Sequence, residues 1–179
     1  MSNVRRHEKG FIRMKHYTYS FAIAALFLSP WSTSVHAVEV AADYKCTDHL
    51  DPEALVKGFV QSGFIQSPAY AENDFIAYFR PTQRLTAFGF PLVAVAAFKE
   101  ESAYFNRVPG TSPGNRFALV VQASESQVLS VVRKRGLSIA GFQDTRYPAL
   151  RIESFSTEPM PKGSIQGLPY TQILCLPKV

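Results

Sequence analysis

The sequence has few of the side chains on which catalysis and metal binding most often depend. Only two cysteines and four histidines occur in 179 residues, and three of the histidines precede residue 38. His49 is the single imidazole after that point, and a lone histidine without a second soft ligand makes a poor zinc site. Its acidic neighbours Asp48, Asp51 and Glu53 are suited to the positive end of a helix dipole. We therefore expect no metal and no cofactor.

A long apolar segment that could cross a bilayer is also missing. The N-terminal apolar run, Phe21 to Trp31, is shorter than the roughly 20 residues of a transmembrane helix. Five basic residues precede it, and small and polar residues ending in Val35-His36-Ala37 follow it. This order is typical of a cleavable secretory signal peptide. We predict a signal peptide over residues 1–37, with Met14 as an alternative start, and a single globular domain over residues 38–179.

The strong positive charge of the whole chain does not extend to the predicted mature part. Five of the 19 basic residues and one of the 14 acidic residues precede residue 38, which leaves 14 and 13 and a net charge of +1. Nucleic-acid binding needs a clustered excess of lysine and arginine. We therefore expect no nucleic-acid partner.

The two cysteines, Cys46 and Cys175, lie near opposite ends of the predicted domain. Export would place them in an oxidising compartment, where disulfides form and persist. Closing so long a loop is worth roughly 5 kcal/mol as an upper figure in the chain-entropy account. We predict a Cys46–Cys175 disulfide, with two buried free thiols as the alternative.

Two segments carry the signals of a helix. Asp51-Pro52-Glu53 supplies an N-cap carboxylate, a proline at the first helical position and an acidic first turn, and Gly63 supplies a stop. Ser124 and Gln127 have capping-box spacing, and Gly136 ends the second segment. The two predicted helices span the same number of positions, so a decayed internal duplication is an open alternative.

Short apolar and aromatic runs bounded by proline and glycine predict strands. The predicted strands cover residues 74–80, 85–98, 116–122, 137–142, 149–155 and 170–176. In the second of these, Pro91 and Gly89 predict a bulge or bend, because proline cannot donate to a central ladder. Strand runs with two interspersed helices favour an α+β fold, a mostly antiparallel sheet with both helices packed on one face.

The connection over residues 99–115 contains a turn-rich tip that matches a nucleophile motif in residue pattern but not in predicted structural context. Gly110-Thr111-Ser112-Pro113-Gly114 reads G-x-S-x-G, but a nucleophile elbow needs a strand before it and a helix after it. No histidine follows the serine to act as its base. Connections of this kind often carry binding residues. We therefore select Arg107, Thr111, Ser112 and Asn115 as candidate binding residues of this tip and predict no catalytic residue.

The remaining candidates have ordinary structural explanations. Glu100 with Glu101, and Glu72 with Asp74, are carboxylate pairs that mark solvated ends of elements. Arg133-Lys134-Arg135 complements the C-terminal end of a helix dipole, with contact to an anionic surface as the alternative. The aromatic residues of the strands belong to the core, with a lipophilic pocket as the alternative. They are Phe75, Tyr78, Phe79, Phe88, Phe90 and Phe98.

The predicted function is a periplasmic or secreted binding domain whose partner is another protein. The sequence leaves enzymatic activity open but favours a non-enzymatic role, because no catalytic set is present. The general profile is similar, at the level of class only, to small periplasmic inhibitor or immunity proteins. A carrier of a small lipophilic ligand and a structural component of an envelope assembly are the alternatives, and the oligomeric state stays open.

Overall fold

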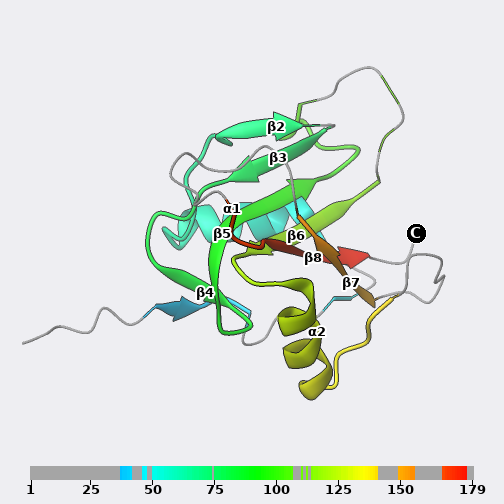
Figure 1. Cartoon of the computed structure of the whole chain (residues 1–179). Helices are drawn as coiled ribbons and strands as arrows, with labels where there is room; N and C mark the ends of the chain where they lie inside the picture. Colours follow the sequence, from blue (N-terminus) through cyan, green and yellow to red (C-terminus); the bar gives the residue numbers. More distant parts are fainter. Residues whose placement is uncertain are drawn as a thin grey trace, which may run out of the picture. The chain divides into compact units, whose positions relative to one another are not determined.

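A computed structural model describes residues 37–41, 46–47, 50–73, 75–106, 110, 112, 114–140, 149–155 and 167–176 (Figure 1). All of these lie in one compact unit, Val35–Val179. The predicted signal peptide lies outside the described residues except for its last residue, Ala37. Within the described ranges, no helix combines the length and the apolar character needed to cross a bilayer.

Both predicted helices form, with the predicted caps. Helix α1 spans Pro52–Gln61, and the Asp51 side chain accepts hydrogen bonds from the backbone N–H groups of Glu53 and Ala54. Helix α2 spans Glu125–Lys134 and begins with the complete capping box of Ser124 and Gln127. Gly63 and Gly136, two residues beyond the respective helix ends, have φ values of +67° and +68°, which a glycine adopts without strain.

Eight strands form one open and mostly antiparallel sheet, as predicted. They are β1 (Val38–Glu39), β2 (Ala71–Asn73), β3 (Ile76–Phe79), β4 (Leu85–Ala87), β5 (Phe90–Phe98), β6 (Arg116–Val121), β7 (Ala149–Ser154) and β8 (Thr171–Leu176). The main order is β1-β4-β5-β6-β8-β7. The long strand β5 pairs with β6 on one side and with β4 and then β3 on the other. Among these strands only β1 and β4 run parallel.

The predicted single strand over 85–98 is two strands joined by a tight reversal. Phe88 and Gly89 both have positive φ values, +56° and +82°, which is the pattern of a type I′ hairpin turn. The Glu39 carboxylate accepts hydrogen bonds from the backbone N–H groups of Phe88 and Gly89 at 2.8 and 2.9 Å. Phe88 adopts a conformation that is rare for non-glycine residues. The burial of its ring and the hydrogen bond from its backbone N–H to Glu39 stabilise this conformation.

The main core lies between the two helices and one face of the sheet. Val56 of α1 and Val128 and Val132 of α2 are fully buried and belong to the same apolar cluster as Val95 and Leu119 of the sheet. Both helices therefore cover the same face, as the sequence predicted. The predicted disulfide is confirmed: Cys46 is bonded to Cys175 of β8, with 5.3 Å between their Cα atoms. It fixes the chain before α1 to β8, the strand next to the β7 edge of the sheet.

Two further segments differ from the sequence prediction. Strand β2 lies outside the strands predicted from the sequence, and Ala71–Asn73 pairs with β3 as a short antiparallel hairpin. The expected strand at 137–142 is limited in the described residues to one bridge between Ile139 and Leu150. The first part of the 99–115 connection folds onto the core, where Phe105 is buried against Phe98.

Candidate binding surface

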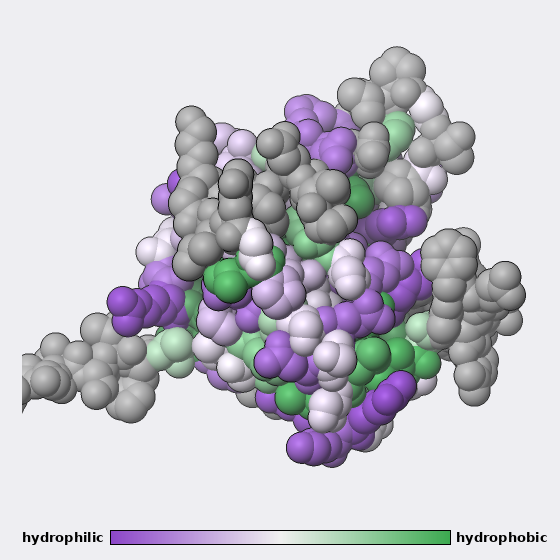
Figure 2. Space-filling view, viewed as in Figure 1, coloured by the Kyte–Doolittle hydropathy of each residue, from purple (hydrophilic) through white to green (hydrophobic). Residues whose placement is uncertain are grey.

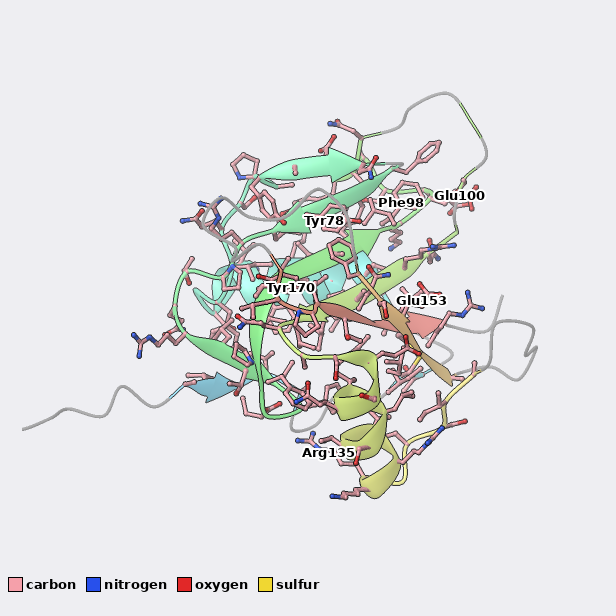
Figure 3. All side chains as sticks on the ribbon, viewed as in Figure 1. Tyr78, Phe98, Glu100, Arg135, Glu153 and Tyr170 are labelled. Atoms are coloured by element: carbon pink, nitrogen blue, oxygen red, sulfur yellow. A yellow bond between two sulfur atoms is a disulfide. The ribbon has the colours of Figure 1, made fainter. Side chains whose placement is uncertain are left out.

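The sheet has a second face on which neither helix packs, and we call it the open face; its central side chains are at most 8% exposed, so the side chains that reach solvent lie toward its edges. Cross-strand pairing places Tyr78, Ala96, Ala118, Leu174 and Arg151 in one row across five strands. A second row runs through Ala94, Val120, Gln172 and Glu153. In Figure 3, Tyr78 and Glu153 come from strands near opposite sides of the sheet, and α1 lies behind it.

Small residues form the floor of the open face. Ala96 and Ala118 are 2% and 1% exposed and form a second apolar cluster with Tyr78 and Leu174. Phe155, just after β7, packs on this cluster, and its ring centroid lies 6.0 Å from that of Tyr78. The alanines leave room for aromatic rings to lie over the middle of the sheet. The open face is therefore built from aromatic side chains on a small-residue floor.

One edge of the open face carries an arginine stacked on a tyrosine. Tyr70 packs against the same apolar cluster, and the guanidinium carbon of Arg80 lies 5.4 Å from the centroid of its ring. Burial raises the pKa of the Tyr70 hydroxyl, the neighbouring Tyr78 raises it further, and Arg80 opposes the shift. The Tyr70 hydroxyl thus stays protonated at neutral pH. This edge presents a cation beside the neutral phenol of Tyr70.

The opposite edge is also polar. Arg151 Nη1 lies 3.6 Å from Glu153 Oε1, and Gln172 beside them is 8% exposed. Tyr170 is half-buried at the start of β8, and its carbonyl accepts the backbone N–H of Phe155. Arg80 lies at one edge of this face, beside Tyr70, and Arg151 lies at the other, beside Glu153. The open face therefore has aromatic rings in the middle and an arginine at each of these two edges.

The surface is not a single apolar patch. Among described residues the one exposed large hydrophobic side chain is Val38, which belongs to β1. Figure 2, which has the same view as Figure 1, shows hydrophilic and hydrophobic residues interspersed over the described part of the molecule. A mixed surface of this kind is typical of protein interfaces, which as a whole are about as polar as the rest of a protein surface.

Two candidate binding residues of the 99–115 connection, Ser112 and Asn115, form hydrogen bonds with other residues of that connection. Asn115 Oδ1 accepts the backbone N–H of Glu100 at 3.0 Å, and Ser112 Oγ accepts the backbone N–H of Gly114 at 3.1 Å. Both side chains thus help to shape the loop. Arg107 and Thr111 lie outside the described residues, so the four residues stay a prediction as a binding site.

The acidic residues at the start of α1 also have structural partners. Lys99 Nζ donates to Asp51 Oδ2 at 2.8 Å, which lowers the pKa of Asp51 and raises that of Lys99. Lys57 Nζ donates to Glu53 Oε1 at 2.6 Å and lowers the pKa of Glu53. Asp48 and His49 lie outside the described residues. Among the described residues, no group of three or more histidine, cysteine, aspartate or glutamate side chains could hold a metal ion.

Most of the strand aromatics belong to the main core. Phe79, Phe88 and Phe98 are at most 2% exposed and pack against other core residues. Tyr78 differs because it points to the open face. Tyr70 and Arg80 escaped the sequence reasoning, since each stands alone in a segment without a motif. The one available signal was the alternation of Tyr78 and Arg80 along the predicted strand over 74–80.

Comparison with known proteins gives no relative. No protein-family model matches the chain, and neither a curated protein nor a solved structure matches it. The open face is therefore interpreted from its own residues.

Proposed function

We propose that the protein is an exported, non-enzymatic binding domain whose partner is another protein, and that the open face is its contact surface. One observation carries the proposal: tyrosine and arginine concentrate on the one face of the sheet that the helices leave uncovered. Tyr70, Tyr78, Arg80, Arg151 and Tyr170 all lie there or at its edges.

Tyrosine and arginine are enriched among the residues that contribute most to binding energy in protein interfaces. Tyrosine offers a large contact area for few rotatable bonds, and arginine offers several directed donors. Here the rings rest on a rigid sheet, and the Cys46–Cys175 disulfide ties that sheet to the segment before α1. A surface already ordered before binding loses little conformational entropy when a partner docks.

Export rests on the N-terminal pattern over residues 1–37 and on the disulfide, which persists in oxidising compartments. The proposed location is the periplasm or the medium, and the proposed class is that of small inhibitor or immunity proteins. Cell fractionation and the intact mass of the purified protein test this. Loss of residues 1–37 is expected, and retention of the complete N-terminal segment in cytoplasmic protein would contradict export.

An affinity capture tests the binding function. The oxidised protein, purified as the cell exports it, is immobilised and incubated with envelope extracts and culture fluid. The double variant Tyr70→Ala/Tyr170→Ala removes two half-buried rings from the open face. The matched control Arg133→Ala/Lys134→Ala removes two exposed side chains from α2.

We expect one near-stoichiometric protein to bind the unmodified protein and the α2 control, and to bind the open-face variant at least tenfold more weakly. Circular dichroism of all three proteins checks that each is folded. Equal capture by the open-face variant and the unmodified protein would remove the open face from the proposal. An empty capture by folded protein would contradict a protein partner and favour a small ligand.

A further inference from the structure

We propose that Arg80 is a receptor for a carboxylate side chain presented by the protein partner, held at the edge of the open face beside Tyr70. This inference rests on the proposed function and names the chemistry that the partner must supply. The partner's contact region would accordingly carry an aspartate or glutamate at this position.

The inference begins with the surroundings of Arg80. The side chain is half-buried, and its Nε atom is buried without a hydrogen-bond partner. No carboxylate lies within ion-pair distance of Arg80 among the residues that the structure describes. The Tyr70 ring lies beside it, with its centroid 5.4 Å from the guanidinium carbon. Charged groups that are withdrawn from water normally have a paired charge or a full set of hydrogen bonds.

Two other half-buried cations among the described residues have a carboxylate close by. Lys99 is hydrogen-bonded to Asp51 at 2.8 Å, and Arg151, whose Nε is likewise buried without a hydrogen-bond partner, has its Nη1 3.6 Å from Glu153. Arg80 is thus partly buried and has no carboxylate partner among the described residues. An acidic group docking here would meet a cation that has already lost part of its hydration, and the ion pair would compete with less water.

The geometry also limits how the carboxylate can approach. Because Nε is buried, an incoming group reaches the guanidinium through its terminal nitrogens, end-on, rather than through the Nε side of the fork. Stacking on Tyr70 restricts the plane of the guanidinium. A planar carboxylate can accept two parallel N–H bonds from the terminal nitrogens, an arrangement in which the hydrogen bonds are charge-assisted. The neutral phenol of Tyr70 adds no repulsion toward an anion.

Nuclear magnetic resonance of the arginine side chains tests the inference directly. The Nε–H signals of the exported, oxidised protein are recorded while the capped peptide acetyl-Gly-Glu-Gly-amide is added at low salt. The control probes are acetyl-Gly-Gln-Gly-amide, which has the same shape without the charge, and inorganic phosphate. The signal that is absent from Arg80→Gln identifies Arg80. The matched control variant is Arg84→Gln, which removes an exposed arginine four residues away.

We expect the glutamate peptide to shift the Arg80 signal in a saturable way, and the glutamine peptide and phosphate to shift it at least fivefold less at equal concentration. Arg80→Gln should weaken binding of the glutamate peptide at least fivefold, whereas Arg84→Gln should leave it unchanged. Equal shifts by all three probes, or no saturable shift of any arginine Nε–H signal of the unmodified protein by the glutamate peptide, would overturn the inference even if Arg80→Gln fails to fold.

The same variants separate this inference from the proposed function. If the affinity capture yields a partner that Arg80→Gln binds as well as the unmodified protein does, the carboxylate receptor is wrong and the protein-binding function stands. If the glutamate peptide binds at Arg80 but no protein is captured, the receptor chemistry stands without a protein partner, and the inference fails in its choice of ligand source.

Discussion

The two faces of the sheet are made by the same strands and have opposite characters. On the helix-covered face, β5, β6 and β8 contribute Val95, Leu119 and Ile173, which are fully buried beneath α1 and α2. On the open face the same three strands contribute Ala96, Ala118 and Leu174, over which Tyr78 and Phe155 lie. Large aliphatic side chains thus serve a closed core, and small ones support a layer of aromatic rings.

The difference indicates which face carries stability and which carries recognition. Branched aliphatic side chains packed against helices give the closely packed interior of a domain. Tyrosine and arginine at the margin of the open face combine apolar contact area with polar groups that can reach a partner. We therefore expect substitutions on the helix-covered face to affect unfolding, and substitutions on the open face to affect binding. The following predictions, from the largest expected effect to the smallest, test that division.

The largest effect is expected for Phe117→Ala on the helix-covered face. The Phe117 side chain is fully buried, and its ring stacks on Phe59 of α1 with 5.9 Å between the centroids. Its loss should lower the free energy of unfolding by about 3–5 kcal/mol, because a cavity replaces a ring between sheet and helix. Urea denaturation measures this. A loss below about 1 kcal/mol would show that α1 contributes little to the main core.

A matched pair of alanines compares the two faces directly. Ala97 and Ala96 are neighbours on β5, and both are at most 2% exposed. Ala97→Leu should cost about 1–3 kcal/mol, because α1 and the sheet leave no room for three more carbon atoms. Ala96→Leu should cost less, since the Tyr78 and Phe155 rings above it can turn toward solvent. Urea denaturation of both variants is the measurement, and near-ultraviolet circular dichroism reports on the displaced rings. An equal or larger cost at Ala96 would mean that the open face is packed as tightly as the other.

Glu39 links the first strand to the helix-covered core. Its carboxylate accepts the N–H groups of Phe88 and Gly89 and also that of Ala41, at 3.0 Å. Glu39→Ala should lower the free energy of unfolding by about 1–2 kcal/mol, because these donors lose their acceptor. Glu39→Gln keeps one acceptor oxygen and should lose less. If alanine and glutamine are equally tolerated in thermal unfolding, the carboxylate does not hold the turn.

The smallest effect is expected from pH at the start of α1. The Lys99 ammonium lowers the pKa of Asp51 in the folded protein. The resulting stabilisation is present above the ordinary aspartate pKa and is lost as the pH falls through the lowered value. Because both side chains are partly exposed, solvent screens the pair and the contribution is small. Asp51→Asn should flatten the fall in stability between about pH 4 and pH 2. A steeper fall in this variant, measured by urea denaturation at each pH, would contradict the sign.

Local signals in the sequence were sufficient for the helices and the fold class, and the presence of only two cysteines together with the predicted export led to the disulfide. The caps at Asp51 and Ser124 and the stops at Gly63 and Gly136 depend on neighbouring residues, so they can be recognised without tertiary information. The turn at Phe88-Gly89 was harder, because phenylalanine rarely adopts a positive φ and Glu39, which holds the turn, lies 49 residues away. Strand β2 was missed because its residues, Ala71–Asn73, have weak strand propensity.

The candidate surface could not be predicted because it depends on register across the sheet. Strands β5 and β6 are buried on both sides, so their sequences are continuous apolar runs and do not show which residue faces which side. Tyr70 and Arg80 meet only after the β2–β3 hairpin has formed. The residues selected from the sequence, Arg107, Thr111, Ser112 and Asn115, were chosen from turn composition, which locates a connection but carries no information on which side chains meet across the sheet.

Hydroxyl-radical footprinting of the captured complex tests the central claim most directly. It compares the oxidation rate of individual side chains in the free protein and in the complex. We predict at least threefold protection of Tyr70 and Tyr170, with unchanged rates at Leu129 on α2. Protection confined to residues 112–115 or to α2, with Tyr70 and Tyr170 oxidised as in the free protein, would contradict the assignment of recognition to the open face.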